Sequence, residues 1–196
     1  VVKAKEDYCL RHEIPYPHYN RLAGRPIKPS ALYETLKAKG AFFEEVYGSE
    51  RPRWFAKGDV AQEDHYSFRC TVVDDLVAEE VRAVRERVGI MDVTAFTKVL
   101  VEGPDAFALL ERLTANRMPR KVGSITLTHM LNRRGRIELE TTIVRMAEDR
   151  FYLVCAAFFE QRLLDHLAAH RNWADVTVTA LSDVWGALAL NGPRAR

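Results

Sequence analysis

Two carboxylates two residues apart, Glu138 and Glu140, are the strongest candidates for chemistry in this chain. They lie in a stretch where polar and apolar residues alternate, and in a β-strand such alternation places both acids on one face. The apolar run 125–131 and the glycine at position 135 precede them, so the segment predicts a β-hairpin. A carboxylate held on a rigid strand can transfer a proton or bind a polar heterocycle.

The same two acids fit a second interpretation, a solvated sheet face without a ligand. Exposed strand carboxylates are common, and surface ion pairs contribute little to stability. The acids would then pair with nearby arginines, namely Arg134, Arg136 or Arg145. His129 is a lone imidazole with no second His or Cys at metal-ligand spacing, so the sequence predicts no metal site.

Strand-like and helix-like segments are interleaved along the chain, which indicates an α+β fold: a mainly antiparallel sheet with packed helices. Ser30 would cap the second helix, and Asp74 or Asp75 the third. Residues 48–52 are predicted to form a turn. The predicted helices cover 3–10, 31–39, 76–88, 104–113 and 158–170. The predicted strands cover 41–47, 96–101, 125–131, 137–145, 151–157, 176–181 and 185–190, and the last two would pair with each other.

Length and composition are those of an ordinary globular chain. Its 196 residues, 47% hydrophobic and 29% charged, suffice for one sizeable core or for one domain plus an extension. The net charge of +2 points to neither a nucleic acid nor a membrane surface. The cysteines at 9, 70 and 155 are odd in number and far apart, which argues against disulfides and for a reducing compartment. Cys155 lies in an apolar run and is interpreted as a buried thiol.

Four segments resemble, in the same order, those of one known family, the aminomethyltransferases, which include the glycine-cleavage T-protein. The segments are 88–94, 101–106, 130–140 and 185–193. In the third, Met130-Leu131-Asn132 and Gly135 precede the acid Glu140 as they do in the family's folate-binding hairpin. The same domain forms the C-terminal half of sarcosine and dimethylglycine dehydrogenases. The resemblance covers residues 29–196.

The resemblance implies roles for individual residues. Glu140 would be the acid that contacts the folate ring, where the family usually has Asp. Met130 and Tyr152 would pack against the pterin, and Glu138 would be a further cofactor contact. Asp92, after an apolar run, is expected to cap a turn. Tetrahydrofolate is therefore the expected cofactor here. FAD would bind outside this chain, because no Gly-x-Gly-x-x-Gly follows a strand in it.

The resemblance also predicts a domain organisation. Residues 1–29 would be a linker, or the end of a preceding flavin oxidoreductase domain, because Gly24-Arg25-Pro26 resembles the segment that joins the flavin and folate halves. Residues 30–196 would be the N-terminal part of a folate-binding domain. The sequence begins at Val1 without Met and ends just after a Gly-Pro turn, so we expect a fragment of a longer chain.

The implied function is the tetrahydrofolate-binding portion of a flavin-dependent N-methyl amine dehydrogenase of the sarcosine or dimethylglycine type. The one-carbon unit would pass to folate as methylene-tetrahydrofolate, and the fragment alone would be inactive. A flavin-free aminomethyltransferase is one alternative. A non-catalytic scaffold is another, to which Arg136 and Cys155-Ala156 point as departures from the T-protein pattern. The expected partners are folate and the amine, without nucleic acid or membrane and with room for an oligomer. The expected location is the cytoplasm, or the mitochondrial matrix in a eukaryote.

Overall fold

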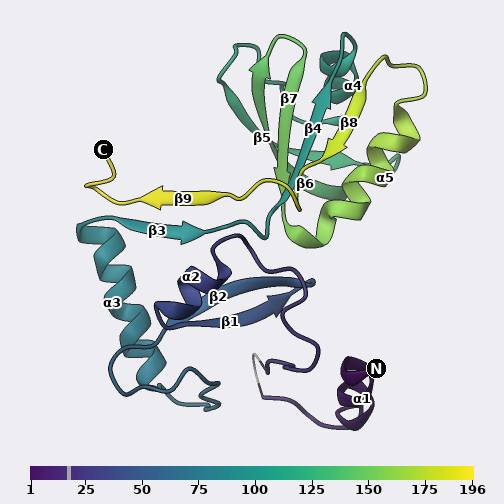
Figure 1. Ribbon diagram of the computed structural model, residues 1–196. Coiled ribbons are helices and arrows are strands. Elements are labelled where there is room, and N and C mark those ends of the chain that lie inside the picture. The colour runs from purple at the N-terminus through teal and green to yellow at the C-terminus, as the bar shows by residue number, and fades with distance from the viewer. Residues whose placement is uncertain (17–18) are drawn as a thin grey trace. The chain divides into compact units, whose positions relative to one another are not determined.

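The protein, represented by a computed structural model that describes residues 1–16 and 19–196, divides into two compact units (Figure 1). Unit 1 comprises Val1–Val93 and Ala187–Arg196, and unit 2 comprises Thr94–Gly186. Each unit combines helices with antiparallel strands, so the predicted α+β class is confirmed. Among the described residues, no helix is long and apolar enough to cross a membrane.

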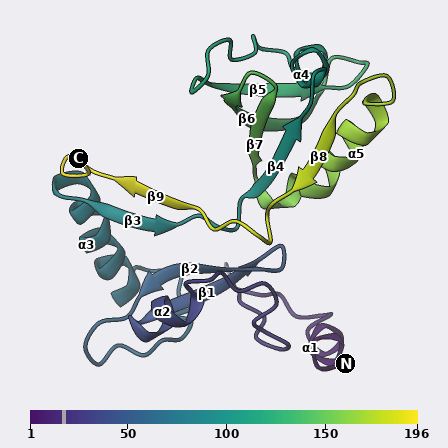
Figure 2. The same cartoon turned by 45° about the horizontal axis from the view of Figure 1, so that its top comes forward.

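Unit 2 is built on a five-stranded antiparallel sheet in the order β5-β6-β7-β4-β8 (Figure 2). Its strands are β4 (Thr97–Glu102), β5 (Ile125–Leu131), β6 (Ile137–Ala147), β7 (Arg150–Cys155) and β8 (Thr177–Ala180). Its helices are α4 (Ala106–Leu113), the short η1 (Ala157–Phe159) and α5 (Glu160–His170). Since β6 alternates as the sequence predicted, one face of this sheet can be buried while the other stays partly open.

The core of unit 2 lies between one face of the sheet and the helices α4 and α5. Leu109 and Leu110 on α4 and Leu163 and Leu167 on α5 are fully buried there. They pack with strand residues that alternate along the sheet, namely Val99, Val101, Met130, Leu139, Ile143, Phe151 and Leu153. We call the opposite side of the sheet the outer face. Its central positions are occupied by residues such as Glu140, Thr142, Tyr152 and Val154, which are exposed or half-buried.

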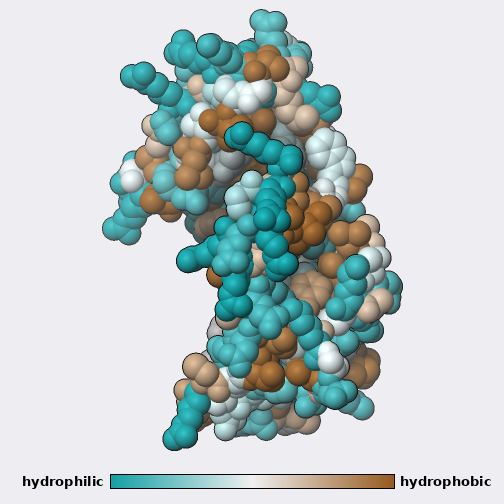
Figure 3. Space-filling view, turned by 90° about the vertical axis from the view of Figure 1, so that its left-hand side faces the viewer, coloured by the Kyte–Doolittle hydropathy of each residue, from teal (hydrophilic) through white to brown (hydrophobic). Residues whose placement is uncertain are grey.

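Unit 1 contains two separate two-stranded antiparallel sheets, β1-β2 and β3-β9. The strands are β1 (Ala41–Val46), β2 (Ser49–Phe55), β3 (Gly89–Asp92) and β9 (Leu188–Asn191). The helices are α1 (Val2–Cys9), α2 (Tyr33–Ala38) and α3 (Val72–Glu86). Beside α3 lies an apolar groove of about 680 Å³, lined by Val77, Val81 and Met91 among others. Figure 3, which looks from the side where α3 lies in Figure 1, shows apolar atoms exposed among polar ones.

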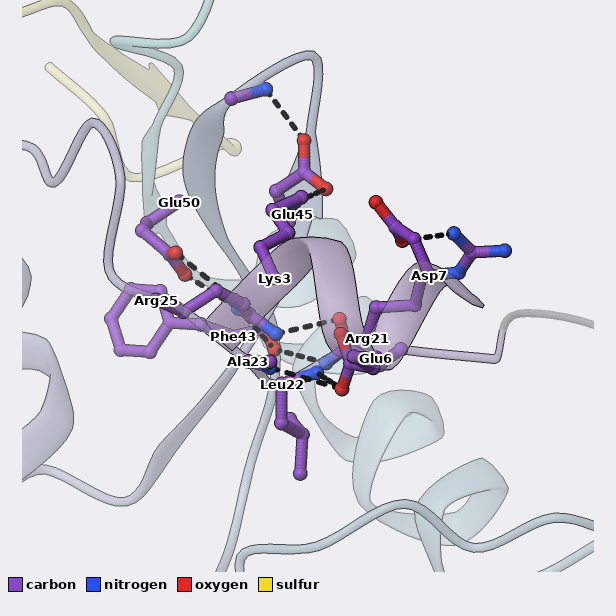
Figure 4. A network of polar contacts seen from close by, with 12 residues as sticks. Lys3, Glu6, Asp7, Arg21, Leu22, Ala23, Arg25, Phe43, Glu45 and Glu50 are labelled. Atoms are coloured by element: carbon purple, nitrogen blue, oxygen red, sulfur yellow. Dashed lines mark hydrogen bonds and ion pairs between the residues drawn. The ribbon is translucent and has the colours of Figure 1, made fainter. Parts of the chain in front are cut away.

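Residues 20–25 are fastened to the β1-β2 hairpin by a buried polar network (Figure 4). The Arg25 guanidinium donates to both carboxylate oxygens of Glu50, at 3.0 and 2.5 Å, and to the carbonyl of Phe43. Asn20 accepts from Arg25 and donates to the same carbonyl. On α1, Glu6 accepts the backbone N–H groups of residues 22 and 23. Where the structure describes it, the predicted linker is therefore a packed part of unit 1.

Three local predictions in unit 1 are wrong. The predicted turn 48–52 is the beginning of β2, which pairs with β1. The third helix begins before the predicted residue 76, because Thr71 caps α3 and Asp74 completes a capping box with it. Ser30 does not cap α2, whose N-cap is Leu32; its hydroxyl donates to Asp92 and accepts from the backbone of residue 32.

The predicted pairing of the last two strands is also wrong. β8 pairs with β4, and β9 pairs with β3, a strand that the sequence pattern did not predict. Both pairings join strands that are far apart in the sequence. The prediction was wrong because it paired two strands that follow each other in the chain. The other predicted helices and strands fall within a few residues of their expected bounds.

Candidate functional site on the outer face of unit 2

The β5-β6 hairpin is organised by the side chain of Asn132. Its amide oxygen accepts from the backbone N–H groups of Arg134 and Arg136, at 2.9 and 3.1 Å. Its backbone carbonyl accepts from the backbone N–H of Gly135, which adopts a φ of 71°. A positive φ at this position favours glycine, so the turn geometry fixes how β6 leaves the hairpin.

Glu140 lies on the outer face, directly across from His129 on β5. A carboxylate oxygen of Glu140 lies 3.1 Å from Nε2 of His129, and the two side chains are 57% and 41% exposed. The partner of Glu140 is thus an imidazole and not one of the predicted arginines. An exposed pair of this kind contributes little to stability, and both groups can exchange protons with a ligand or with water.

Tyr152 also lies on the outer face, half-buried on β7. Its ring lies 5.8 Å from the ring of Trp185, centroid to centroid, at an angle of 38°. Burial raises the pKa of the Tyr152 phenol, so the side chain remains a neutral, flat surface with one hydroxyl. Trp185 lies in the segment 185–193, one of the four that resemble the family, but no pattern in the sequence predicts that its ring lies beside Tyr152.

The carboxylate and the aromatic pair lie at two ends of one surface. Tyr152 is opposite Val144, which is four residues beyond Glu140 on β6. At about 3.3 Å per strand residue, the two are roughly 13 Å apart along the strand. Thr142 and Val154, which are opposite each other, lie between them. This arrangement suits an extended ligand with a polar heterocycle better than a compact one.

Met130 lies in the core of unit 2 and not on this surface. Its side chain is fully buried on the helix-covered side of the sheet, opposite Leu139. The structure therefore does not bring Met130 together with Glu140 or Tyr152. The apolar character that suggested a ligand contact is the character of a core residue.

Glu138 is held by partners other than those of Glu140. The register between β5 and β6 shifts at Glu138: Met130 pairs with Leu139 and Leu131 pairs with Ile137, so Glu138 has no partner residue on β5. Its carboxylate accepts from the amide of Asn132 at 2.9 Å and from the guanidinium of Arg162 on α5 at 2.8 and 2.5 Å.

The partners of Glu138 are therefore residues of the fold itself, Asn132 and Arg162. The hydrogen bond from Asn132, and then that from Arg162, lower the pKa of the Glu138 carboxyl below its ordinary value. The predicted partner Arg136 is replaced by Arg162, and the two acids are not joined into one carboxylate pair. The sequence offered no signal for this contact, because Arg162 is 24 residues away.

Other candidates have structural explanations. Cys155 is buried, and burial raises the pKa of its thiol to about 11, which agrees with the predicted inert thiol. Asp92 accepts a hydrogen bond from the hydroxyl of Ser30 at 2.6 Å, a contact within unit 1 between residues 62 positions apart. Among residues 1–16 and 19–196, no three His, Cys, Asp or Glu side chains come together as a metal-binding group.

Comparisons with known proteins agree with this fold. A family model described as the GCVT N-terminal domain matches residues 32–196. The mitochondrial dimethylglycine dehydrogenase of Mus musculus is 36% identical over 99% of this chain, and the mitochondrial sarcosine dehydrogenase of Homo sapiens is 30% identical over 92%. The chain spans only 22% and 23% of these relatives' lengths.

A solved structure, the glycine cleavage system aminomethyltransferase T of Bartonella henselae, matches 86% of the chain with a TM-score of 0.71 and 27% identity. The chain covers 42% of that protein. The resemblance inferred from the four sequence segments is therefore confirmed by sequence and by structure.

Proposed function

The chain belongs to the GCVT N-terminal domain family, and from that membership we propose that it is the tetrahydrofolate-binding portion of a flavin-dependent N-methyl amine dehydrogenase. The relatives named dimethylglycine dehydrogenase and sarcosine dehydrogenase support an oxidoreductase acting on a methylated amine. The observation that carries the folate part is the exposed Glu140–His129 pair on the outer face of unit 2, within the segment that the family model matches.

The side chains of this face fit a reduced pterin. A carboxylate accepts hydrogen bonds from ring N–H groups, and Glu140 is exposed enough to do so. Tyr152 and Trp185 supply flat apolar surface for the rest of an extended molecule. When bound, tetrahydrofolate would supply the nitrogen that accepts the one-carbon unit.

The chain's own residues would orient the ligand and manage a proton. Glu140 would accept a hydrogen bond or a proton from the ligand, and His129, 3.1 Å away, could take that proton onward. FAD would be bound by residues outside this chain, and so would the amine. In a eukaryotic cell the compartment would be the mitochondrial matrix, as the names of the relatives suggest, and in a bacterium the cytoplasm.

Titration with tetrahydrofolate tests this proposal on the wild-type protein, on Glu140→Gln and on Glu102→Gln. Glu102 is the matched control, an exposed carboxylate on β4 that is paired with Arg150. Loss of one charge-assisted hydrogen bond should weaken binding by about tenfold or more in Glu140→Gln. The control should bind as the wild type does. Absence of saturable binding by the wild type would reject the folate site, and equal binding by Glu140→Gln would remove Glu140 from it.

Two other functions are each favoured by one observation. The match to a T-protein structure favours a flavin-free aminomethyltransferase. A scaffold is favoured by a relative named pyruvate dehydrogenase phosphatase regulatory subunit in Mus musculus, which is 31% identical over 95% of this chain. Folate-dependent release of a one-carbon unit from a methylated amine, with bleaching of a flavin absorbance in the complete protein, separates the dehydrogenase from both.

A further inference from the structure

Unit 2 contains a second pocket, of about 330 Å³, where the hairpin turn, the end of α4 and the side of α5 meet. Its lining includes Arg112, Asn132, Arg133, His166 and His170, together with small and apolar residues. Among the described residues that line it there is no carboxylate, and none belongs to the surface around Glu140 and Tyr152.

The two histidines of the pocket, His166 and His170, both belong to α5. Their rings lie 4.6 Å apart on successive turns of α5. Nδ1 of His170 lies 2.8 Å from the backbone carbonyl of His166, which can only accept, so Nδ1 carries the proton of this hydrogen bond. Nε2 of His166 is inaccessible to solvent and has no hydrogen-bond partner within the part of the chain that the structure describes. A molecule in the pocket therefore reaches the ring of His166 but not this nitrogen.

The positive charges around the pocket are only partly explained by the fold. The helix dipole favours cations at the last turn of α4, which accounts for Arg112. It does not account for Arg133, which is exposed in the hairpin turn. Arg162 nearby is neutralised by Glu138 and adds no net charge.

We propose that this pocket binds a small molecule through an oxyanion group, a carboxylate or a phosphate, held by Arg112 and Arg133 beside the ring of His166. Guanidinium groups match the geometry of both oxyanions, and the apolar lining leaves room for a small organic body. The site would be separate from the proposed folate surface, so each can be tested without the other.

Binding should depend on pH through His166. Burial, and then the neighbouring His170, lower the pKa of His166, so its ring is mostly neutral near neutral pH. An anion stabilises the protonated ring, and binding should therefore tighten as the pH falls. The charged and titratable groups that face His166 are His170 and Arg162 on its own helix, Glu138 on β6, and the pocket residues Arg112 and Arg133.

The test is a titration of the intact protein with inorganic phosphate and, separately, with acetate, followed through the imidazole NMR signals. Arg133→Gln removes a proposed contact, whereas Arg134→Gln removes the same charge from the next residue of the turn, which does not line the pocket. We expect saturable shifts at His166 and His170, weakened about tenfold in Arg133→Gln and within about twofold of wild type in Arg134→Gln.

The outcomes separate the proposal from general charge attraction. The anion that saturates at lower concentration identifies whether the group is a phosphate or a carboxylate. Tighter acetate binding at about pH 6 than at about pH 8 supports the part assigned to His166, because acetate keeps its charge over this range and these values bracket the ordinary range of histidine. Absence of saturation with both anions, or equal loss in both variants, would overturn the proposal.

Discussion

Replacing Glu50 by glutamine should destabilise unit 1 far more than its position on a two-stranded sheet suggests. The Glu50 side chain is fully buried, and the side chain of its partner Arg25 is 9% exposed. Both carboxylate oxygens accept from the guanidinium, and the same guanidinium serves Asn20 and the carbonyl of Phe43. The hydrogen bond to Glu50 raises the pKa of Arg25 against the opposing effect of burial, and because arginine is so strong a base it stays charged in the variant.

The expected loss follows from leaving that charge buried without its counter-ion. Breaking a buried ion pair by removing one partner costs about 3–5 kcal/mol, a large share of the roughly 5–15 kcal/mol that a domain has in total. The matched control is Glu44→Gln on the facing strand. Glu44 pairs with Arg51, whose side chain is 50% exposed, and such a surface pair contributes less than about 1 kcal/mol.

Native-state hydrogen exchange measures both effects where they occur. The backbone amides of β1 and β2 should lose several kcal/mol of protection in Glu50→Gln and little in Glu44→Gln, while those of the five-stranded sheet in unit 2 should keep theirs. A double variant, Arg25→Met with Glu50→Leu, should recover most of the loss because no charge is left buried. Equal loss in the two single variants, or a double variant as unstable as Glu50→Gln, would refute the reasoning.

Three further predictions concern unit 2. Met130→Ala should cost about 2–5 kcal/mol in urea unfolding and leave tetrahydrofolate affinity unchanged, because the side chain is fully buried in the core. Because the pKa of Glu138 is lowered in the folded state, the ionised carboxylate contributes its full stabilisation above the unfolded-state pKa. That stabilisation is lost as the pH falls through the folded-state pKa. Arg162→Gln should make this loss of stability at acid pH smaller, as measured by pH-jump unfolding curves. Cys155 should stay unreactive toward a thiol reagent until unit 2 unfolds, whereas the other two cysteines are exposed and should react at once.

Much of unit 2 could be predicted from the sequence because its signals are local. Alternation along β6, together with the asparagine and glycine of the turn, is sufficient to predict the hairpin. The helical spacing of α4 likewise identifies its buried side. Patterns of this kind report which face of one element is apolar, and a single large core makes that information sufficient.

The prediction was poorer where distant residues set the local structure. The second residue of β2 is Glu50, a buried glutamate that is paired with Arg25, 25 residues earlier, and the strand also contains Pro52. Neither residue type favours a strand, so the segment reads as a turn. The start of α3 is different, because Thr71 and Asp74 form a capping box whose residue types and spacing are visible in the sequence itself.

The candidate site shows the same division between local and distant information. Alternation predicts that Glu138 and Glu140 lie side by side on one face. The register shift at Glu138 changes this, and the Glu138 carboxylate instead binds the guanidinium of Arg162 on α5. If Glu138 bound a ligand instead, it would give up its hydrogen bonds with Asn132 and Arg162, whereas Glu140 would give up only a weak surface pair with His129. Of the two acids, Glu140 is therefore the one that a ligand on the outer face can bind with the smaller loss of contacts within the protein. If folate binds here, changing Glu138 should affect it only through the stability of the hairpin, and changing Glu140 should affect it directly.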